Sequence, residues 1–364
     1  MKIEELCAKL RSVEDPRRTN KGNIRHKLED IIVIGLCSMI CNGNDFSDME
    51  DFGEARQAWL EQFLELPHGI PDSDTFRRVF ERLNPASLAD CLYDWLGQHR
   101  PNGSVIAIDG KTICGSKHKD HKAYHVVSAF VAENQLTLGE VATDEKSNEI
   151  TAVPELLDLI DVEGSIVTAD AMSCQKEITR KICDKKADYV IALKQNQPTL
   201  WNDANLYFQT NADKLPSICT AEKDHGRIES RTYQLLTNIS WLEDRAQWAG
   251  LNAIGMVKSK RICQGQESVE YRYYITSLTD VEQFAHAVRK HWNIENQLHW
   301  CLDVIFREDA GRARKALSPL NLNVLRKTAL ALCRNAEFGK RVSLQKRRYL
   351  ASLDPDVLQQ ILLR

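Results

Sequence analysis

Two aspartates each follow a short apolar run with the composition of a buried β-strand. Asp109 follows Val-Ile-Ala-Ile, and Asp170 follows Ile-Val-Thr-Ala. A carboxylate at the end of a buried strand is unfavourable unless a cation compensates its charge, and Lys111 or a metal ion could do so. If the two strands are neighbours in one sheet, both carboxylates emerge at the same edge. They would then suit Mg²⁺, which prefers carboxylate oxygens and water. The alternative for Asp109 is an ordinary turn aspartate, because Gly110 follows it.

A third acid, Glu295, lies in a long segment with helical periodicity. Glu295, His299 and Asp303 recur at four-residue spacing beside an apolar stripe, so they share one helix face. Trp292 and Trp300 flank the glutamate, which places it next to the buried edge of the helix. The alternative is a solvent-facing glutamate at a helix boundary. Three other acids compete for the same role: Asp303, Glu308 and Asp309.

The elements that must position these acids fall into four segments of the chain. Residues 1–100 predict a helical N-terminal domain, and residues 101–195 predict the first part of an α/β catalytic domain, in which three strands are followed by a helix, a strand, a helix and a strand. Residues 196–279 alternate apolar and polar positions and predict a β-rich insertion. Residues 280–364 return to helical periodicity and carry Glu295. The N-terminal helices are expected at residues 28–41, 54–64 and 75–83.

The composition is that of a globular protein and does not by itself indicate nucleic-acid binding. The chain has 364 residues, of which 43% are hydrophobic and 27% charged, and its length predicts two or three structural units. A net charge of −3 argues against a uniformly basic coat protein. It does not exclude a DNA enzyme, because phosphates respond to local clusters of positive charge.

Several clusters of Lys and Arg could contact DNA, although a solvated face is the commoner explanation for each cluster taken alone. They are residues 17–27, residues 117–122 and residues 312–315, and the last cluster follows the glutamate segment closely. Lys194, after a core strand, and Arg227, in the insertion, are further candidates, for which a strand exit and a hairpin turn are the alternatives. The arginines at 77, 78 and 82 lie off the apolar stripe of their helix and predict either DNA recognition or a solvated face.

The sequence predicts a cytoplasmic protein with reduced thiols. The longest apolar run, residues 31–41, is far shorter than the roughly 20 residues that span a bilayer, and the acidic start has no secretion-signal pattern. The eleven cysteines are odd in number and scattered, which favours buried thiols over disulfides. Cys37 and Cys41 are one helical turn apart, but no matching Cys or His pair completes a zinc site.

Five separated motifs resemble, in order, the H-repeat-associated transposases, a bacterial insertion-sequence family of DDE enzymes. The resemblance runs over nearly the whole chain, including the Asp-Pro-Arg at residues 15–17. The motifs are Ala-Ile-Asp-Gly-Lys at 107–111, Glu-Lys-Ser-Asn-Glu-Ile at 145–150, Ala-Asp-Ala at 169–171, His-Gly-Arg-Ile-Glu at 225–229 and His-Trp-Asn-Ile-Glu-Asn at 291–296.

This resemblance implies a ribonuclease-H-like core in which Asp109, Asp170 and Glu295 form the metal-binding catalytic triad. It also implies Mg²⁺ as cofactor, with Mn²⁺ as a substitute, DNA ends and target DNA as partners, and a homodimer on DNA. The function implied is DNA strand cleavage and strand transfer during transposition. Candidate DNA contacts are Arg17, Arg18, Lys111, Lys194, Arg227, Arg289 and His291.

The chain departs from a motif of related transposases, Tyr-x2-Arg-x3-Glu-x6-Lys. Val288, His291, Glu295 and Leu302 occupy its four positions, so only the glutamate is retained. Arg289, Lys290 and His291 are the expected substitutes in contacting DNA. Two alternatives therefore stay open: a catalytically inactive, DNA-binding descendant of a transposase, and a metal-dependent nuclease without strand transfer.

Overall fold

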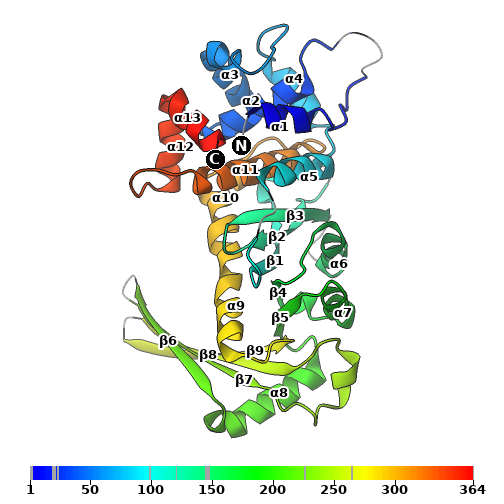
Figure 1. The fold of residues 1–364 in the computed structure, drawn as a ribbon, viewed down its shortest axis with the longest axis vertical. Helices are drawn as coiled ribbons and strands as arrows, with labels where there is room; N and C mark the ends of the chain where they lie inside the picture. Colours follow the sequence, from blue (N-terminus) through cyan, green and yellow to red (C-terminus); the bar gives the residue numbers. More distant parts are fainter. Residues whose placement is uncertain are drawn as a thin grey trace.

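The computed structural model describes residues 3–18, 22, 24–97, 100–119, 121–143, 148–224, 227–263 and 265–363. Along the long axis, helices occupy one end, a sheet flanked by helices occupies the middle, and long β-ribbons occupy the other end (Figure 1). No helix among the described residues is long and apolar enough to cross a membrane.

The helical end combines segments from both ends of the chain, and all of them share one apolar core. Helix α2 is buried along almost its whole length because it packs against α3, α11 and α12. The N-terminal helices are α1 (Ile3–Leu10), α2 (Leu28–Ile40), α3 (Phe46–Leu60), α4 (Ser73–Phe80) and α5 (Pro85–Leu96). The C-terminal helices are α11 (Ser318–Asn335), α12 (Leu344–Leu353) and α13 (Pro355–Leu362).

The helix predicted at residues 54–64 begins earlier in the structure, as α3 at Phe46. The reason is a capping box: the Asp45 side chain accepts from the Asp48 backbone N–H, and the Asp48 side chain accepts from the Asp45 N–H. These reciprocal bonds satisfy the first backbone donors and start the helix well before its apolar positions become dense. The helices predicted at 28–41 and 75–83 correspond to α2 and α4 with small shifts at their ends.

The central sheet has the predicted mixture of strands and helices. Its strand order is β3-β2-β1-β4-β5-β9-β8-β7-β6. Strand β2 pairs antiparallel with both β1 and β3, whereas β4 and β5 run parallel to β1. Helices α6 and α7 cover one face, and α9 (Val281–Asn293), together with α5 and α11, covers the other (Figure 1). The core elements are β1 (Val105–Thr112), β2 (His125–Val131), β3 (Leu136–Thr143), α6 (Glu149–Leu159), β4 (Ile166–Ala169), α7 (Lys176–Asp184) and β5 (Asp188–Leu193).

The segment after β5 continues the same sheet. Strand β9 pairs antiparallel with β5, so the ribbons extend the core sheet directly. The alternation predicts strands at residues 228–236, 252–262 and 269–278, which correspond to β7, β8 and β9, whereas the exposed strand β6 and the helix α8 are not predicted. Leu200, Ala204 and Phe208 are the buried residues of α8, and their four-residue spacing is the helical signal that was missed. The elements are α8 (Pro198–Asn211), β6 (Ser217–Asp224), β7 (Arg227–Leu236), β8 (Ala253–Cys263) and β9 (Gln266–Thr276).

The periodicity predicts one continuous α-helix for the segment that carries Glu295, but the structure differs. The segment consists of α9 (Val281–Asn293), a π-helical turn (Ile294–His299) and α10 (Trp300–Val304). The Asp280 side chain caps α9 by accepting from the Gln283 backbone N–H at 2.8 Å. Gly255 of β8 lets α9 approach the sheet closely, because a Cβ at that position would overlap the Phe284 ring.

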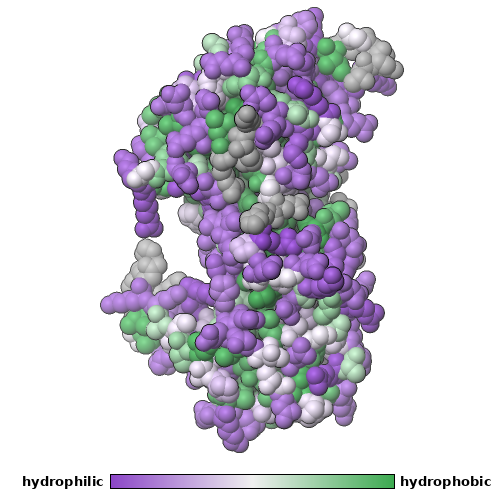
Figure 2. Space-filling model, in the orientation of Figure 1, coloured by the Kyte–Doolittle hydropathy of each residue, from purple (hydrophilic) through white to green (hydrophobic). Residues whose placement is uncertain are grey.

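The surface is polar over most of the face shown in Figure 2. This face is hollowed between the projecting ribbons of β6–β9 and the C-terminal helices, beside α9. Such a hollow gives an extended partner room to approach the middle of the molecule.

Candidate active site

Asp109 and Asp170 occupy matching positions with respect to two neighbouring parallel strands, β1 and β4. Ile108 of β1 pairs with Ala169 of β4, and each aspartate is the next residue. The condition under which both carboxylates would emerge at one edge of the sheet, that the two strands be neighbours, is therefore met. The prediction that Asp109 ends its strand is wrong: β1 runs on to Thr112, because β2 continues to pair with it as far as Thr112 and His125.

Backbone groups hold Asp170 in place. Its Oδ1 accepts from the backbone N–H groups of Met172 at 2.9 Å and Ser173 at 3.4 Å, so the carboxylate caps the 3₁₀ turn that follows β4. Burial, with a further contribution from the charge of Glu149, raises the pKa of Asp170 above its usual value. A nearby cation would therefore stabilise its ionised form.

The ring of His299 lies close to the carboxylates of both Glu295 and Asp109. The Nδ1 atom of His299 is 3.2 Å from Glu295 Oε2 and 3.6 Å from Asp109 Oδ2. Each of these three residues offers one potential ligand atom, and the three atoms lie within 4.8 Å of one another. The hydrogen bond with His299 lowers the pKa of Glu295, whereas burial raises the pKa of Asp109 to about 6.

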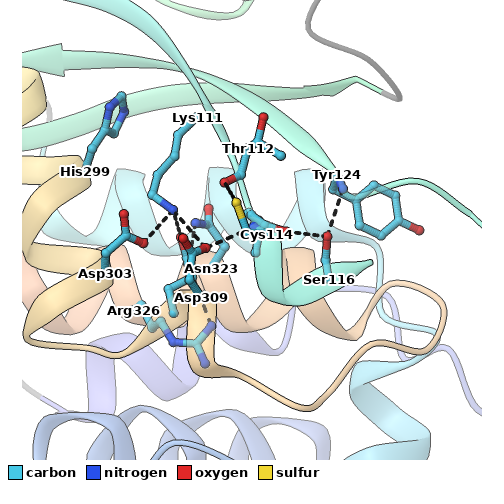
Figure 3. Close-up of polar contacts among 12 residues, drawn as sticks. Lys111, Thr112, Cys114, Ser116, Tyr124, His299, Asp303, Asp309, Asn323 and Arg326 are labelled. Atoms are coloured by element: carbon cyan, nitrogen blue, oxygen red, sulfur yellow. Dashed lines mark hydrogen bonds and ion pairs between the residues drawn. The ribbon is translucent and has the colours of Figure 1, made fainter. Parts of the chain in front are cut away.

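The competing acids belong to a different cluster, centred on Lys111 (Figure 3). Lys111 Nζ lies 2.8 Å from Asp303, 3.0 Å from Glu308 and 3.6 Å from Asp309, the three acids that compete with Glu295. Within the described part of the chain, Lys111 pairs with these three acids and not with Asp109, so it is not the counter-ion that the sequence suggested. Its side chain is only 10% exposed, and its charge is balanced by acids of the same chain. Lys111 is therefore poorly placed to meet a phosphate.

The three predicted acids line one cavity of about 510 Å³. Two tryptophans, Trp201 and Trp292, and two cations, Lys194 and Arg272, line it as well. The Arg272 guanidinium lies 5.1 Å from the centre of the Trp292 ring, in cation–π geometry. Carboxylates that are partly removed from water and gathered in one cavity are suited to a divalent cation, because the cation offsets their mutual repulsion.

The remaining predicted DNA contacts have varied surroundings. Lys194 is exposed at the cavity and Arg18 is exposed near the N-terminus, whereas Arg17 pairs with Asp15 at 2.7 Å. Arg289 pairs with Glu222 of β6 at 2.6 Å. The side chain of Arg227 lies outside the described residues, as do His225 and Gly226.

His291 faces the cavity as a neutral ring. Its Nδ1 is 2.9 Å from the Thr168 hydroxyl oxygen, and burial lowers its pKa to about 4. A neutral imidazole offers no positive charge to a phosphate at neutral pH, so His291 could contact DNA only as a hydrogen-bonding group.

Sequence reasoning missed a buried pair next to the acids. His125 Nε2 lies 2.6 Å from Glu149 Oε1, and Thr112 Oγ1 lies 2.9 Å from His125 Nδ1. The pair packs against the backbone of Gly110, where a Cβ would overlap both side chains. The motif at residues 145–150 contains Glu149 and was the available signal.

Comparisons with known proteins define the class. Residues 100–332 match the family model described as Transposase DDE domain, and residues 7–96 match the model described as DDE_Tnp_1-associated. The chain belongs to the DDE transposase family, whose members are polynucleotidyl transferases that use divalent metal ions.

Individual relatives show which group of DDE transposases the chain resembles. The chain is 39% identical to "Putative transposase YncI" of Escherichia coli O157:H7, over 96% of this chain and 93% of that protein. It is 36% identical to "H repeat-associated putative transposase YhhI" of Escherichia coli (strain K12), over 100% of this chain and 98% of that protein. The resemblance to the H-repeat-associated transposases is thus confirmed. A piggyBac transposase in a synaptic complex with hairpin DNA aligns over 99% of this chain and 80% of its own, with 10% identity and a TM-score of 0.41.

Proposed function

We propose that Asp109, Asp170 and Glu295 hold the divalent metal ions of this DDE transposase, and that DNA strands are cut and rejoined in the cavity they line. The observation that carries the proposal is that acids from two neighbouring strands and one helix, far apart in sequence, line a single cavity. Mg²⁺ suits this oxygen-rich set, and Mn²⁺ is the expected substitute.

The sheet topology supports a ribonuclease-H-like core. Three antiparallel strands, β1 to β3, are followed by β4 and β5, which run parallel to β1 and lie on its other side. In such a core, helices cover both faces and the acids collect where β1 and β4 are adjacent. The ribbon segment at residues 196–279 then separates the second acid from the third.

The roles of the chain's own groups follow from their positions. When bound, the metal ions would supply the positive charge that activates water or a DNA 3′-hydroxyl and stabilises the leaving oxygen. Asp170 is kept in orientation by its two backbone donors. Lys194, exposed at the mouth of the cavity, is placed to attract a phosphate. Because joining two DNA ends requires both to be held, we propose that two copies of the chain act together on DNA.

A strand-cleavage assay with candidate element ends tests this function. Asp109→Asn and Asp170→Asn keep the side-chain shape but remove charge that the metal requires, so cleavage should collapse while DNA binding persists. Asp184→Asn is the matched control, because Asp184 is exposed at the end of α7, away from the cavity. Mn²⁺ should support the wild-type reaction, whereas Ca²⁺ should not, because Ca²⁺ takes more ligands at longer distances.

The alternative outcome is equally specific. A wild-type protein that binds DNA but never cleaves candidate ends with either Mg²⁺ or Mn²⁺ would identify an inactive descendant. Cleavage without any joined product would identify a nuclease. Undiminished cleavage in both Asn variants would place the active site elsewhere.

A further inference from the structure

The imidazole of His299 occupies the space between two of the proposed metal-binding acids. Its Nδ1 is 3.2 Å from Glu295 Oε2 and 3.6 Å from Asp109 Oδ2. The side chain is only 6% exposed, whereas the Glu295 side chain is 57% exposed. His299 is therefore a buried part of this site, and a group that joins β1 to the glutamate helix.

His299 lies at the end of a π-helical turn. Residues 294–299 form the turn, with Glu295 near its start and His299 at its end. A π turn has more residues per turn than an α-helix, so a side chain is re-aimed relative to the regular helices on either side. Such single turns cost stability that an ordinary helix would retain, and they are frequently found at functional sites.

The second ring nitrogen of His299 does not explain its burial. Nε2 is buried and has no hydrogen-bond partner in the part of the chain that the structure describes. Asp303, one turn further along, turns instead to Lys111, as Figure 3 shows. The polar interactions of the ring are thus directed at Asp109 and Glu295 through Nδ1.

We propose that His299 is a metal ligand, so that one divalent ion is held by the carboxylates of Asp109 and Glu295 and by the Nδ1 nitrogen of His299. This inference rests on the proposed metal site and adds a nitrogen donor to it. Ligand atoms that bind one ion at adjacent positions lie about 3 Å apart, given bonds of about 2.1 Å. The observed separations of 3.2 Å and 3.6 Å are close to this spacing.

A nitrogen donor changes which ion the site prefers. Mg²⁺ is a hard ion that favours oxygen ligands, whereas imidazole is a better ligand for first-row transition metals. Ligation through Nδ1 requires its lone pair, so the ring proton would reside on Nε2. The site should therefore favour Mn²⁺ over Mg²⁺ more strongly than a site built from three carboxylates.

Pulsed electron paramagnetic resonance of the full chain loaded with Mn²⁺ tests this ligand directly. A directly bound imidazole gives a nitrogen hyperfine coupling, which a hydrogen-bonded ring outside the coordination sphere does not give. We expect this coupling in the wild type and its loss in His299→Gln, with a lowered Mn²⁺ affinity. His291→Gln is the matched control, because His291 lines the same cavity but is bonded to Thr168.

A second variant, His299→Asp, and the dependence of Mn²⁺ binding on Asp109 distinguish the failure of the His299 inference from the failure of the proposed metal site. His299→Asp should still bind Mn²⁺ but without nitrogen coupling, and its preference for Mn²⁺ over Mg²⁺ should be weaker than that of the wild type. Mn²⁺ that is bound in an Asp109-dependent manner but shows no nitrogen coupling would overturn the His299 inference and leave the proposed acids in place. Coupling lost in His291→Gln and kept in His299→Gln would also overturn it. Mn²⁺ binding that Asp109→Asn does not change would overturn the proposed metal site itself.

Discussion

Asp109 and Asp170 each follow one member of the same parallel pair, Ile108 and Ala169, on the adjacent strands β1 and β4. Strand pairing therefore sets the distance between the two carboxylates, since each aspartate comes directly after a paired residue. Because β1 continues through Asp109 whereas β4 ends before Asp170, one acid is fixed by the sheet and the other by the cap it forms on the next turn. Two acids fixed in this way can hold a metal with little reorganisation.

Lys194→Ala should weaken DNA binding uniformly across sequences. Lys194 is exposed and lines the cavity, so a phosphate contact there would release about one counterion. The slope of log affinity against log salt should fall in magnitude by about one, as measured by fluorescence anisotropy at several salt concentrations. Lys186→Ala is the control, because this exposed lysine pairs with Glu163 away from the acids. Equal slopes for wild type and Lys194→Ala would show that Lys194 does not contact DNA.

Lys111→Met should destabilise the fold. The substitution removes the cation that the fully buried Glu308 shares with Asp303 and leaves Glu308, within the described chain, only the more distant Arg326, at 3.7 Å; breaking a buried ion pair costs about 3–5 kcal/mol. Urea unfolding measures the loss. The double variant Lys111→Met/Glu308→Gln should recover part of it, because it removes the uncompensated charge as well. An unchanged unfolding free energy, accompanied by weakened DNA binding, would instead return Lys111 to the set of DNA contacts.

Gly110→Ala should also destabilise the protein, by about 1–3 kcal/mol, because the new methyl group would overlap His125 and Glu149. The comparison is Gly339→Ala, since a Cβ at Gly339 meets nothing within 4 Å. Thermal unfolding of the two variants should therefore differ clearly. Similar melting temperatures would mean that the His125–Glu149 pair yields easily and does not brace β1.

Asp30 should make the protein less stable as pH rises. Burial, reinforced by the charge of Glu29, raises the pKa of Asp30 from its ordinary value of 3.8 to about 6 in the folded chain. The folded state binds the proton more tightly than the unfolded state does. Stability therefore falls as pH rises from about 4 to about 6 and stays lower above that range.

Asp30→Asn removes this dependence and should raise the unfolding free energy at pH 8 by on the order of 2–3 kcal/mol relative to wild type. The gain should disappear near pH 4. Asp51→Asn, at an exposed position of α3, is the comparison. Unfolding curves at the two pH values measure both variants, and a gain that is the same at pH 4 and pH 8 would contradict the assignment.

The sequence by itself determined most of the local structure and supplied Asp109, Asp170 and Glu295 as the candidate acids. Short apolar runs predicted the core strands because strands that are buried on both faces are apolar at consecutive positions. The motifs around Asp109, Asp170 and Glu295 predicted the family, and the comparisons confirmed it. The early start of α3 could also have been found from sequence, because its capping box is a local signal.

The tertiary structure alone decided which charged groups meet. Lys111 and Asp109 lie two residues apart on one strand, yet Lys111 pairs with acids nearly two hundred residues away because the chain after α10 brings Glu308 beneath it. His299 lies near both Asp109 and Glu295 because the packing of the glutamate segment against β1 brings its ring next to Asp109, and spacing within the segment cannot reveal that contact. Pairing between distant segments depends on the packing of whole elements, which local propensity and spacing do not specify.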